Sequence, residues 1–337
     1  MTKRVYHYLE LKLTWGRTTL MSKNLRWVDI STVIVIIELL VLMSSTLTWA
    51  TENPYRGKVQ LTYVEWSSEI ASANVVKVVL EQLGYEVEII PVTAAAMWQA
   101  VASGEADALV AAWLYTAHAH YLRAVRHQVE YLGPNLEGTK IGLVVPHYVT
   151  INSIEELNAY ADKLGRKIIG IDPGVGLMSK TEEAIKTYHL KFELMESSGA
   201  TMTTMLEKAI TNQQWVVVTG WTPHWIFSRW QLKYLADPKG IYDQKGIYSG
   251  EEHIGTIVRK GLKQDMPEVY RVLDKFYWEP ADMEQVMVWN EENKLAPDAN
   301  AQRWVRENLD KVNCWISPDP NQDCSYLRKK APIIHQH

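Results

Sequence analysis

The sequence predicts an α/β protein of two lobes joined by a two-crossing hinge, with a ligand cleft between the lobes. Its 337 residues are enough to form two hydrophobic cores. From residue 58 onward, short β-rich runs alternate with helical periodicity, the pattern of parallel strands with covering helices. Pro146 and Tyr148 mark a crossing into the second lobe, and the chain is expected to return to the first around residues 248–258.

The first lobe is expected to begin with a β-α-β-α-β series. A serine cap opens a helical segment that Gly84 ends, and the turn at 104–107 leads into the last strand of the series. The predicted elements are strand 58–65, helix 67–83, strand 85–92, helix 93–103 and strand 108–112. A further helix and a turn then lead to the apolar segment 141–146.

The rest of the chain supplies the second lobe and the return to the first. In the second lobe we expect helices 154–164, 177–188 and 201–212, and strands 167–171 and 215–219. After the return we expect helices 267–276, 281–291 and 297–309. The predicted division is 51–145 for the first part of lobe 1, 146–247 for lobe 2, 248–312 for the return segment of lobe 1 and 313–337 for a carboxyl-terminal tail.

Residues 1–50 are expected to be an export signal. The stretch 31–47 is mostly apolar, basic residues precede it and a small-residue cleavage pattern follows it. Glu38 interrupts the apolar run, which favours a cleaved signal peptide over a membrane anchor, while an uncleaved anchor stays open as an alternative. Met21 is an alternative start, because the chain from there has the order of a complete signal peptide. We therefore expect a periplasmic protein, membrane-anchored only if the signal is retained.

Composition and the few special residues exclude several classes of function. The formal net charge of −4 provides no basic face for nucleic acid. Cys314 and Cys324 are predicted to form a local disulfide in an oxidising compartment, and their spacing indicates no metal site. His118 and His120 have no third ligand nearby, so no zinc and no cofactor are expected. His224 is expected to be structural.

Three tryptophans are the main candidates for ligand contact. Trp66, Trp113 and Trp221 each follow a predicted strand, where ligands bind in open α/β sheets. If the lobes close, three indole faces can line one cavity that suits a quaternary ammonium, at about 0.5–2 kcal/mol per face. A buried carboxylate partner for the cation is not expected, because its desolvation is unfavourable. The alternative is three independent core tryptophans.

A glycine-rich loop at 172–179 supplies a candidate site for an anion. The N–H groups of Gly176 and Leu177 are expected to be free at a helix amino end, where a carboxylate or phosphate binds. The loop lacks the Gly-Lys-Ser/Thr of a Walker motif. His118 follows Trp113 by five residues and can donate a hydrogen bond to the same anion. The alternatives are a purely structural turn and a surface histidine.

Five motifs carry a resemblance to a known family. They are Tyr-Val-Glu-Trp-Ser-Ser-Glu-Ile-Ala-Ser (63–72), Met-Trp-Gln-Ala-Val-Ala-Ser-Gly-Glu-Ala-Asp (97–107), Ala-Trp-Leu-Tyr-Thr-Ala-His (112–118), Ile-Gly-Ile-Asp-Pro-Gly-Val-Gly-Leu-Met-Ser (169–179) and Thr-Gly-Trp-Thr-Pro-His-Trp-Ile-Phe-Ser-Arg (219–229). At these motifs, and over roughly 58–290, the chain resembles the glycine betaine-binding proteins of ABC importers, of the OpuA type. Leu-Tyr-Thr-Ala replaces the family's more usual Leu-Pro-Asn-Thr before His118, and Tyr115 can alter the size of the pocket.

The resemblance implies a type II periplasmic-binding-protein fold. It also implies a quaternary-ammonium site in which Trp66, Trp113 and Trp221 form an aromatic cage while the backbone N–H groups of Gly176 and Leu177, with His118, hold the ligand carboxylate. The partners that follow are a small zwitterion and the transmembrane subunits of an ABC permease.

The function expected is that of a non-catalytic receptor. It would capture glycine betaine, or a relative such as proline betaine, carnitine or dimethylsulfoniopropionate, for osmoprotection. A choline receptor is the nearest alternative, although choline would leave the anion donors unpaired, a penalty of about 1–3 kcal/mol. An extracellular enzyme acting on choline esters would need an activated nucleophile, and no Gly-x-Ser-x-Gly motif occurs. A membrane-tethered sensor is the third alternative.

Overall fold

The computed structural model describes residues 55–114, 117–242, 252–293, 295–319, 322 and 324. The predicted signal peptide and Tyr115 lie outside these residues. Of the helices in the described ranges, none combines the length and the apolar character that a membrane crossing requires.

The first sheet has the strand order β2-β1-β3-β10-β4. Its strands are β1 (Lys58–Tyr63), β2 (Glu86–Pro91), β3 (Ala108–Leu114), β4 (Val129–Leu136) and β10 (His253–Arg259). β1 pairs in parallel with β2 and β3, whereas β10 is antiparallel to both β3 and β4. Every residue of β3 is buried, as expected for a central strand covered on both faces.

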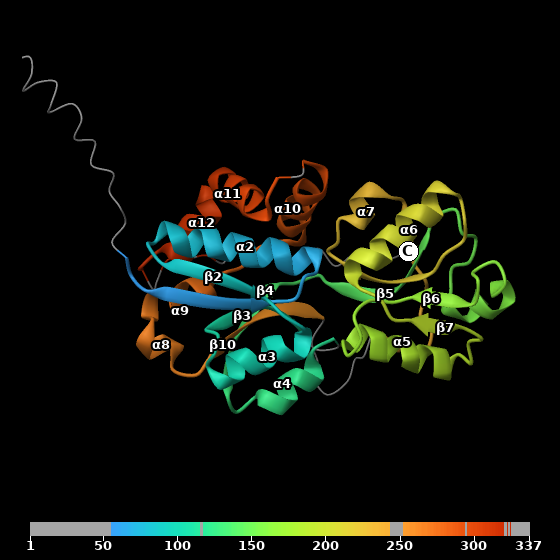
Figure 1. Ribbon diagram of the computed structural model, residues 1–337, viewed down its shortest axis with the longest axis horizontal. Helices are drawn as coiled ribbons and strands as arrows, with labels where there is room; N and C mark the ends of the chain where they lie inside the picture. Colours follow the sequence, from blue (N-terminus) through green and yellow to red (C-terminus); the bar gives the residue numbers. More distant parts are fainter. Residues whose placement is uncertain are drawn as a thin grey trace, which may run out of the picture. The chain divides into compact units, whose positions relative to one another are not determined.

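The second sheet has the order β7-β6-β8-β5-β9 (Figure 1). Its strands are β5 (Lys140–Pro146), β6 (Lys167–Ile169), β7 (Glu193–Met195), β8 (Val218–Thr222) and β9 (Leu232–Tyr234). β6 is parallel to β7 and β8, and β5 is antiparallel to β8 and β9.

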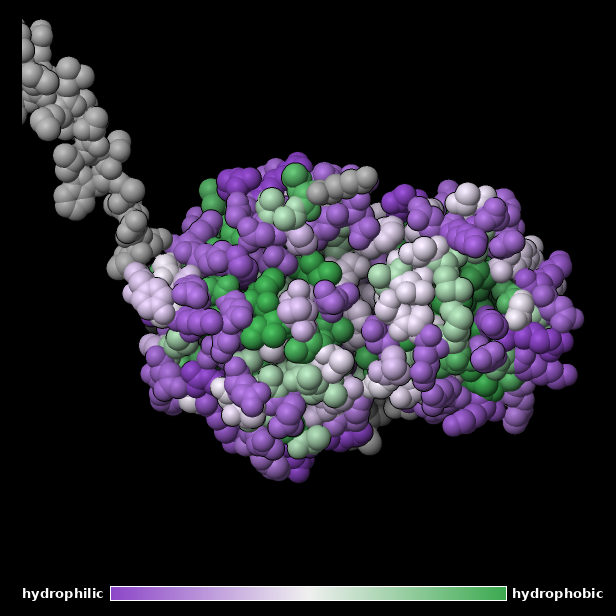
Figure 2. Space-filling view, viewed as in Figure 1, coloured by the Kyte–Doolittle hydropathy of each residue, from purple (hydrophilic) through white to green (hydrophobic). Residues whose placement is uncertain are grey.

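The chain passes from the first sheet to the second between β4 and β5, and it returns between β9 and β10. Each sheet is therefore the centre of one lobe, and the expectation of two α/β lobes is confirmed. Figure 2 shows that polar residues cover most of the visible face, while apolar residues show between them over both lobes.

Helices cover both faces of each sheet (Figure 1). The helices of the first lobe are α2 (Ser67–Gln82), α3 (Ala94–Ser103), α4 (Ala119–Val125), α8 (Leu262–Asp265), α9 (Pro267–Lys275), α10 (Pro280–Glu292), α11 (Pro297–Glu307) and α12 (Leu309–Ile316). Those of the second are the 3₁₀ helix η1 (Ile154–Tyr160), α5 (Gly176–Thr187), α6 (Gly199–Thr211) and α7 (Ile226–Arg229). α2, α10 and α11 lie on one side of the first sheet, and α3 and α4 lie on the other.

Local capping explains several helix boundaries. The Thr93 side chain accepts a hydrogen bond from the Ala96 N–H at the start of α3, and Gly104 ends that helix with φ +80°. The Ser198 side chain accepts from the Thr201 N–H at the start of α6 in the same way. These signals are readable in the sequence, which is why the helix bounds were predicted to within about two residues here.

The structure differs from expectation where pairing is non-local. β4, β7, β9 and α12 were not predicted, and β10 makes the first sheet mixed where a parallel sheet was expected. Trp113 and Trp221 lie inside β3 and β8, because the antiparallel partners Ile254 and Ile141 extend those strands past the predicted ends. The helix expected at 154–164 is the shorter η1.

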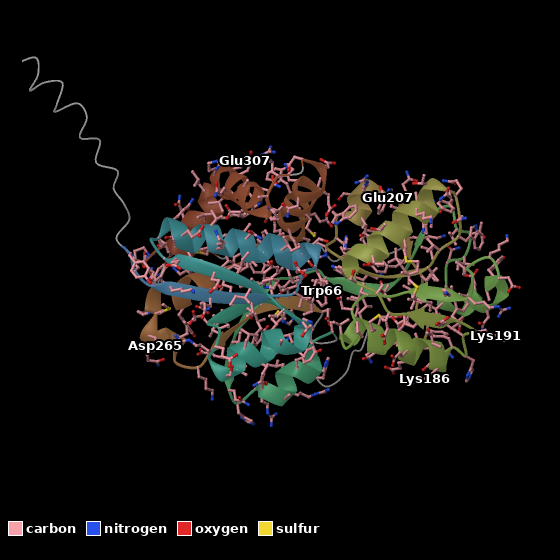
Figure 3. All side chains as sticks on the ribbon, viewed as in Figure 1. Trp66, Lys186, Lys191, Glu207, Asp265 and Glu307 are labelled. Carbon is pink, nitrogen blue, oxygen red and sulfur yellow. A yellow bond between two sulfur atoms is a disulfide. The ribbon has the colours of Figure 1, made fainter. Side chains whose placement is uncertain are left out.

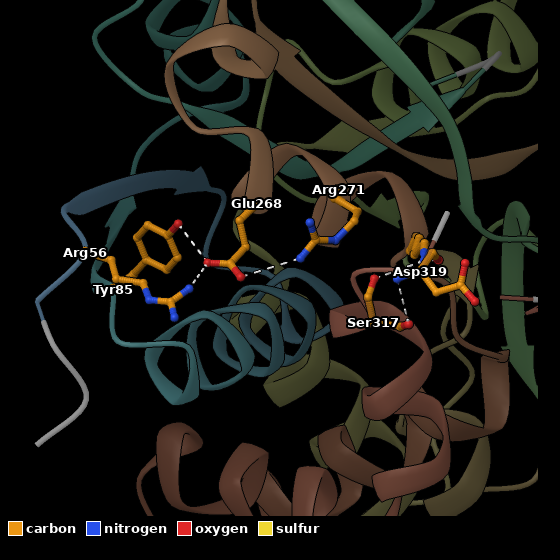
Figure 4. A network of polar contacts seen from close by, with 7 residues as sticks. Arg56, Tyr85, Glu268, Arg271, Ser317 and Asp319 are labelled. Atoms are coloured by element: carbon orange, nitrogen blue, oxygen red, sulfur yellow. Dashed lines mark hydrogen bonds and ion pairs between the residues drawn. The ribbon is translucent and has the colours of Figure 1, made fainter. Parts of the chain in front are cut away.

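Polar contacts join α9 to the start of the described chain and to the residues beyond α12 (Figure 4). Glu268 on α9 accepts hydrogen bonds from Arg56 and from the Tyr85 hydroxyl. The Lys275 ammonium donates to the backbone carbonyls of Ser317 and Asp319, at 3.2 and 2.9 Å. Near this segment the structure has a disulfide between Cys314, which is buried on α12, and Cys324.

Candidate functional site

A cavity lies where the two lobes meet, and every side chain that lines it is apolar or aromatic. The lining residues are Trp66, Trp113 and Ala117 from the first lobe and Ile141, Ile171, Val175, Leu177 and Trp221 from the second. The hollow holds about 310 Å³ of non-atom space, a volume that includes open solvent at its mouth. Figure 3 shows Trp66 between the two sheets. The cavity therefore suits a small ligand with an apolar outer surface.

The three predicted tryptophans meet around this cavity. Trp66 immediately precedes α2, Trp113 is the second-last residue of β3, and Trp221 lies on β8. Their side chains are at least nine-tenths buried, and the ring centroids of Trp66 and Trp221 are 6.3 Å apart with planes inclined at 51°. The structure thus brings indoles from both lobes to one hollow. We call these three residues the cage tryptophans.

Two cage tryptophans are held by carboxylates at their ring edges. The Trp66 Nε1–H donates to Asp172 Oδ2 at 2.9 Å, which connects the two lobes. The Trp113 Nε1–H donates to Glu69 Oε1 at 2.6 Å. For Trp221 Nε1 the described residues provide no acceptor. Because the edges are engaged, the ring orientation is set while the negative faces stay available to a cation.

Sequence reasoning did not identify Glu69 or Asp172. Glu69 is 1% exposed, and it also accepts a hydrogen bond of 2.5 Å from the Ser68 hydroxyl. Burial raises the pKa of its carboxyl to about 7, while the bonds from Ser68 and Trp113 act in the opposite direction. A buried carboxylate therefore does stand near the cage, but it contacts an indole edge and does not line the cavity. The available signal was that a buried indole N–H needs an acceptor.

The glycine-rich loop reaches the cavity at the start of α5, and one of its two candidate N–H groups is already hydrogen-bonded. The Gly176 N–H donates to the Ala117 carbonyl at 3.0 Å, so the expectation that it is free is wrong for this structure. The expectation failed because the acceptor comes from the other lobe. Leu177 lines the cavity, and its N–H has no backbone acceptor among the described residues. Gly174 has φ +84°, which a glycine adopts readily.

His118 is buried directly before α4, not on a surface helix. Its Nδ1 accepts from the Trp113 backbone N–H at 3.2 Å, so the proton of a neutral ring is on Nε2. That Nε2 has no partner among the described residues. Burial, with a smaller effect of nearby His120, lowers the pKa of His118 to about 3, which keeps the ring neutral. The ring lies 6.0 Å from that of Trp66 but is not part of the cavity lining.

Two other histidines have structural surroundings. His224 is buried, accepts from the Ile226 N–H and stands edge-on to the Trp221 ring at 4.4 Å, so it supports a cage tryptophan from behind. The His120 ring contacts that of Tyr121, with centroids 3.9 Å apart and planes inclined at 40°. Within the part of the chain that the structure describes, no group of three potential ligands could hold a metal ion.

Comparison with known proteins gives one family and several close structures. Residues 57–307 match the family described as the substrate binding domain of ABC-type glycine betaine transport system. The glycine betaine/carnitine transport binding protein GbuC of Listeria monocytogenes serotype 1/2a (strain 10403S) is 45% identical over 157 residues. That alignment covers 46% of this chain and 50% of the relative, so it spans about half the relative's length.

Two solved structures are also similar. Lactococcal OpuAC, in its closed-liganded conformation with glycine betaine, is 42% identical, has a TM-score of 0.72, and the match covers 77% of this chain and all of that one. The glycine betaine, L-proline ABC transporter binding protein ProX from Borrelia burgdorferi is 39% identical with a TM-score of 0.73, covering 77% and 97% of the two chains. These findings confirm the resemblance that the motifs indicated and the two-lobed binding-protein fold.

Proposed function

Because the chain belongs to the family of substrate-binding domains of ABC-type glycine betaine transport systems, we propose that it captures glycine betaine or a related zwitterionic quaternary ammonium and delivers it to an ABC permease. The observation that supports this ligand is the convergence of three indoles from two lobes on one apolar cavity. The family consists of binding domains, so this chain is a binding protein rather than an enzyme.

The cage tryptophans are suited to the cationic end of the ligand. A methylated ammonium has no N–H to donate, so a cavity lined by aromatic and aliphatic side chains leaves none of its groups unsatisfied. Three desolvated ring faces would contribute several kcal/mol in total, at about 0.5–2 kcal/mol each. An unmethylated cation would lose hydrogen bonds to water in the same cavity, which favours the quaternary ligand.

The carboxylate end of the ligand is assigned to Leu177, Gly176 and His118. Of these three groups, the Leu177 N–H has no backbone acceptor and the His118 Nε2–H has no partner among the described residues. The Gly176 N–H would exchange the Ala117 carbonyl for the ligand carboxylate. A neutral imidazole donates one hydrogen bond to the carboxylate without adding a charge to the site.

The contacts between the lobes indicate how binding would be coupled to closure. Trp66 donates to Asp172, and the Tyr121 hydroxyl donates to the Gly174 carbonyl at 2.8 Å, so both reach the loop before α5 from the first lobe. A ligand in the cavity would touch both lobes and favour the closed form. The permease would then recognise that form.

A titration that compares glycine betaine with choline tests the assignment. Choline carries the same methylated cation but no carboxylate, so we expect it to bind about 5- to 150-fold more weakly, the equivalent of roughly 1–3 kcal/mol. Calorimetry measures both affinities on the same protein. Equal affinities would contradict the carboxylate site and favour the choline receptor, and absence of binding by both would contradict the cage.

As the binding component of an ABC importer the protein acts outside the cytoplasm. We place it in the periplasm, with residues 1–50 as the signal peptide and the alternative of a retained membrane anchor. The mass of the mature chain distinguishes the two, because cleavage after Ala50 removes those residues.

A further inference from the structure

The carboxyl group of Glu69 is buried behind the cage with no cationic partner. Its Oε1 accepts from the Trp113 indole and its Oε2 from the Ser68 hydroxyl, and none of the ion pairs found among the described residues includes it. A buried carboxylate without a counter-charge is costly, and it persists only when it has a role in structure or in binding. Trp113, whose indole edge donates to Glu69, also lines the ligand cavity.

Both protonation states of Glu69 fit the same hydrogen bonds. As a carboxylate it accepts from Trp113 and Ser68. As a carboxylic acid it would keep one oxygen as the acceptor for the indole N–H and would donate its proton to the serine hydroxyl oxygen. The group can therefore change its charge without moving Trp113, and burial places the pKa of this change at about 7.

Other charged groups near α2 do not determine the protonation equilibrium of the Glu69 carboxyl. Lys77, on the same helix, is paired with Glu81 and with Asp298 of α11. β3 carries no ionisable side chain, and α10 presents Asp282, which bonds Lys311, and Glu284. Only burial, Ser68, Trp113 and the residue's own backbone act on the Glu69 carboxyl. The charge that would act on it most strongly is that of a cation in the cage.

We propose that Glu69 is a positioning residue which holds the Trp113 indole and also supplies a negative charge behind the cage, so that capture of the cation releases the Glu69 proton to the solvent. The proposal rests on the proposed function, because it needs a cationic group against Trp113. The cation favours the ionised carboxyl, and by linkage ligand affinity rises as the pH rises through neutrality.

The experiment is calorimetric titration of glycine betaine into the full chain in two buffers of different ionisation enthalpy. For the wild-type protein near pH 6.5 we expect release of about 0.5 proton per ligand bound, and an affinity gain of about tenfold between roughly pH 5.5 and pH 8.5, as follows from a shift of one pKa unit on binding. Glu69→Gln keeps an oxygen acceptor for the indole. It should therefore bind betaine with little proton release and with an affinity that changes less than about twofold over the same range.

Two control variants test whether the released proton comes from Glu69 or from another carboxyl group. Asp172→Asn removes the negative charge at the edge of Trp66 and keeps an oxygen acceptor for its indole, and proton release should remain. Glu284→Gln removes another acid whose pKa is raised by burial, and proton release should again remain.

Several results would overturn the proposal. They are wild-type binding without proton release, proton uptake instead of release, and the same proton release in wild type and Glu69→Gln. The first two of these results come from the wild-type protein, so they can overturn the proposal even if the variant does not fold. Failure of the wild type to bind betaine at all would overturn the proposed function as well, which distinguishes the two failures.

Discussion

Two clusters of tryptophans in this protein differ in their surroundings: one borders a cavity and the other packs against aromatic rings. The cage tryptophans border a cavity, and carboxylates hold two of their three N–H groups. The other group, which we call the C-terminal cluster, consists of Phe276, Trp278, Trp304 and Trp315. Its rings pack on one another with centroid distances between 5.0 and 5.8 Å, and its three indole nitrogens have no partner among the described residues.

The difference shows how a recognition tryptophan can be told from a core tryptophan. In the C-terminal cluster the faces are satisfied by neighbouring rings, in edge-to-face and stacked pairs. In the cage the edges of Trp66 and Trp113 are satisfied and the faces border empty space. An open face is what a cation-binding ring requires, whereas the held edge distinguishes Trp66 and Trp113, but not Trp221, from the C-terminal cluster. Substitutions in the two clusters should therefore affect different measurable quantities.

The largest effect is expected for Trp304→Ala in the C-terminal cluster. Trp304 is fully buried, so its removal leaves a cavity and should lower the free energy of unfolding by about 3–5 kcal/mol. Denaturant unfolding measures this loss. Betaine affinity of the folded variant should stay within about twofold of wild type, and a loss of affinity as large as that of a cage variant would contradict the division into two clusters.

The free energy of unfolding at acid pH should depend on two buried histidines near the cage tryptophans, His118 and His224. An unfolded histidine binds a proton below about pH 6.5, whereas burial keeps His118 and His224 neutral to about pH 3. The unfolded state then binds more protons, so stability falls on acidification, by about 1.4 kcal/mol per pH unit for each histidine. His118→Gln should show a smaller loss than wild type in urea unfolding between roughly pH 6 and pH 4. The exposed His127→Gln is the control, and equal slopes for all three proteins would contradict the prediction.

Cage variants should lose affinity rather than stability. Trp66→Ala, Trp113→Ala and Trp221→Ala should each weaken betaine binding about tenfold or more, equivalent to at least 1.4 kcal/mol. Phe in place of each Trp should restore part of the loss, because it returns an aromatic face. The measurement is a titration at a temperature where circular dichroism shows a folded protein. Unchanged affinity in any Ala variant would remove that ring from the cage.

The smallest effect is expected at Gly199, where α6 starts beside the cage. A Cβ there would lie 3.4 Å from Trp66 Cδ1 and 3.8 Å from the Trp221 ring, which is ordinary contact. Gly199→Ala should therefore change betaine affinity by less than about threefold, or roughly 0.6 kcal/mol. Gly199→Val would press on both indoles and should bind more weakly than the Ala variant. Equal affinities for the two would indicate that the rings move freely.

The fold was predictable to the extent that its signals are local. Helix α2 was expected at 67–83 and is Ser67–Gln82, because its apolar periodicity is local and Gly84 follows just after its end. The expected serine cap was wrong, since the N-cap residue is Trp66 and no side chain caps the helix. β4 was missed, since its pairing partner β10 lies more than a hundred residues further along the chain. The same long-range pairing extends β3 to include Trp113.

The site was predictable in its residue types but not in its hydrogen bonds. Repeated tryptophans near strand ends indicated a shared aromatic cavity, and the structure places all three around one. The state of the Gly176 N–H was mispredicted, and the carboxylates at the indole edges were not foreseen. Each of these hydrogen bonds joins one donor to one acceptor. Which donor meets which acceptor depends on how the helices, strands and loops pack together.

The sequence alone predicted that the chain forms two α/β lobes and made Trp66, Trp113 and Trp221 the candidates for a shared aromatic pocket, because periodicity, capping and residue chemistry act over a few residues. Only the tertiary structure decided which N–H groups remain unpaired and which acids lie behind the rings. Those outcomes depend on atoms distant in sequence approaching within about 3 Å, a distance that no local pattern specifies.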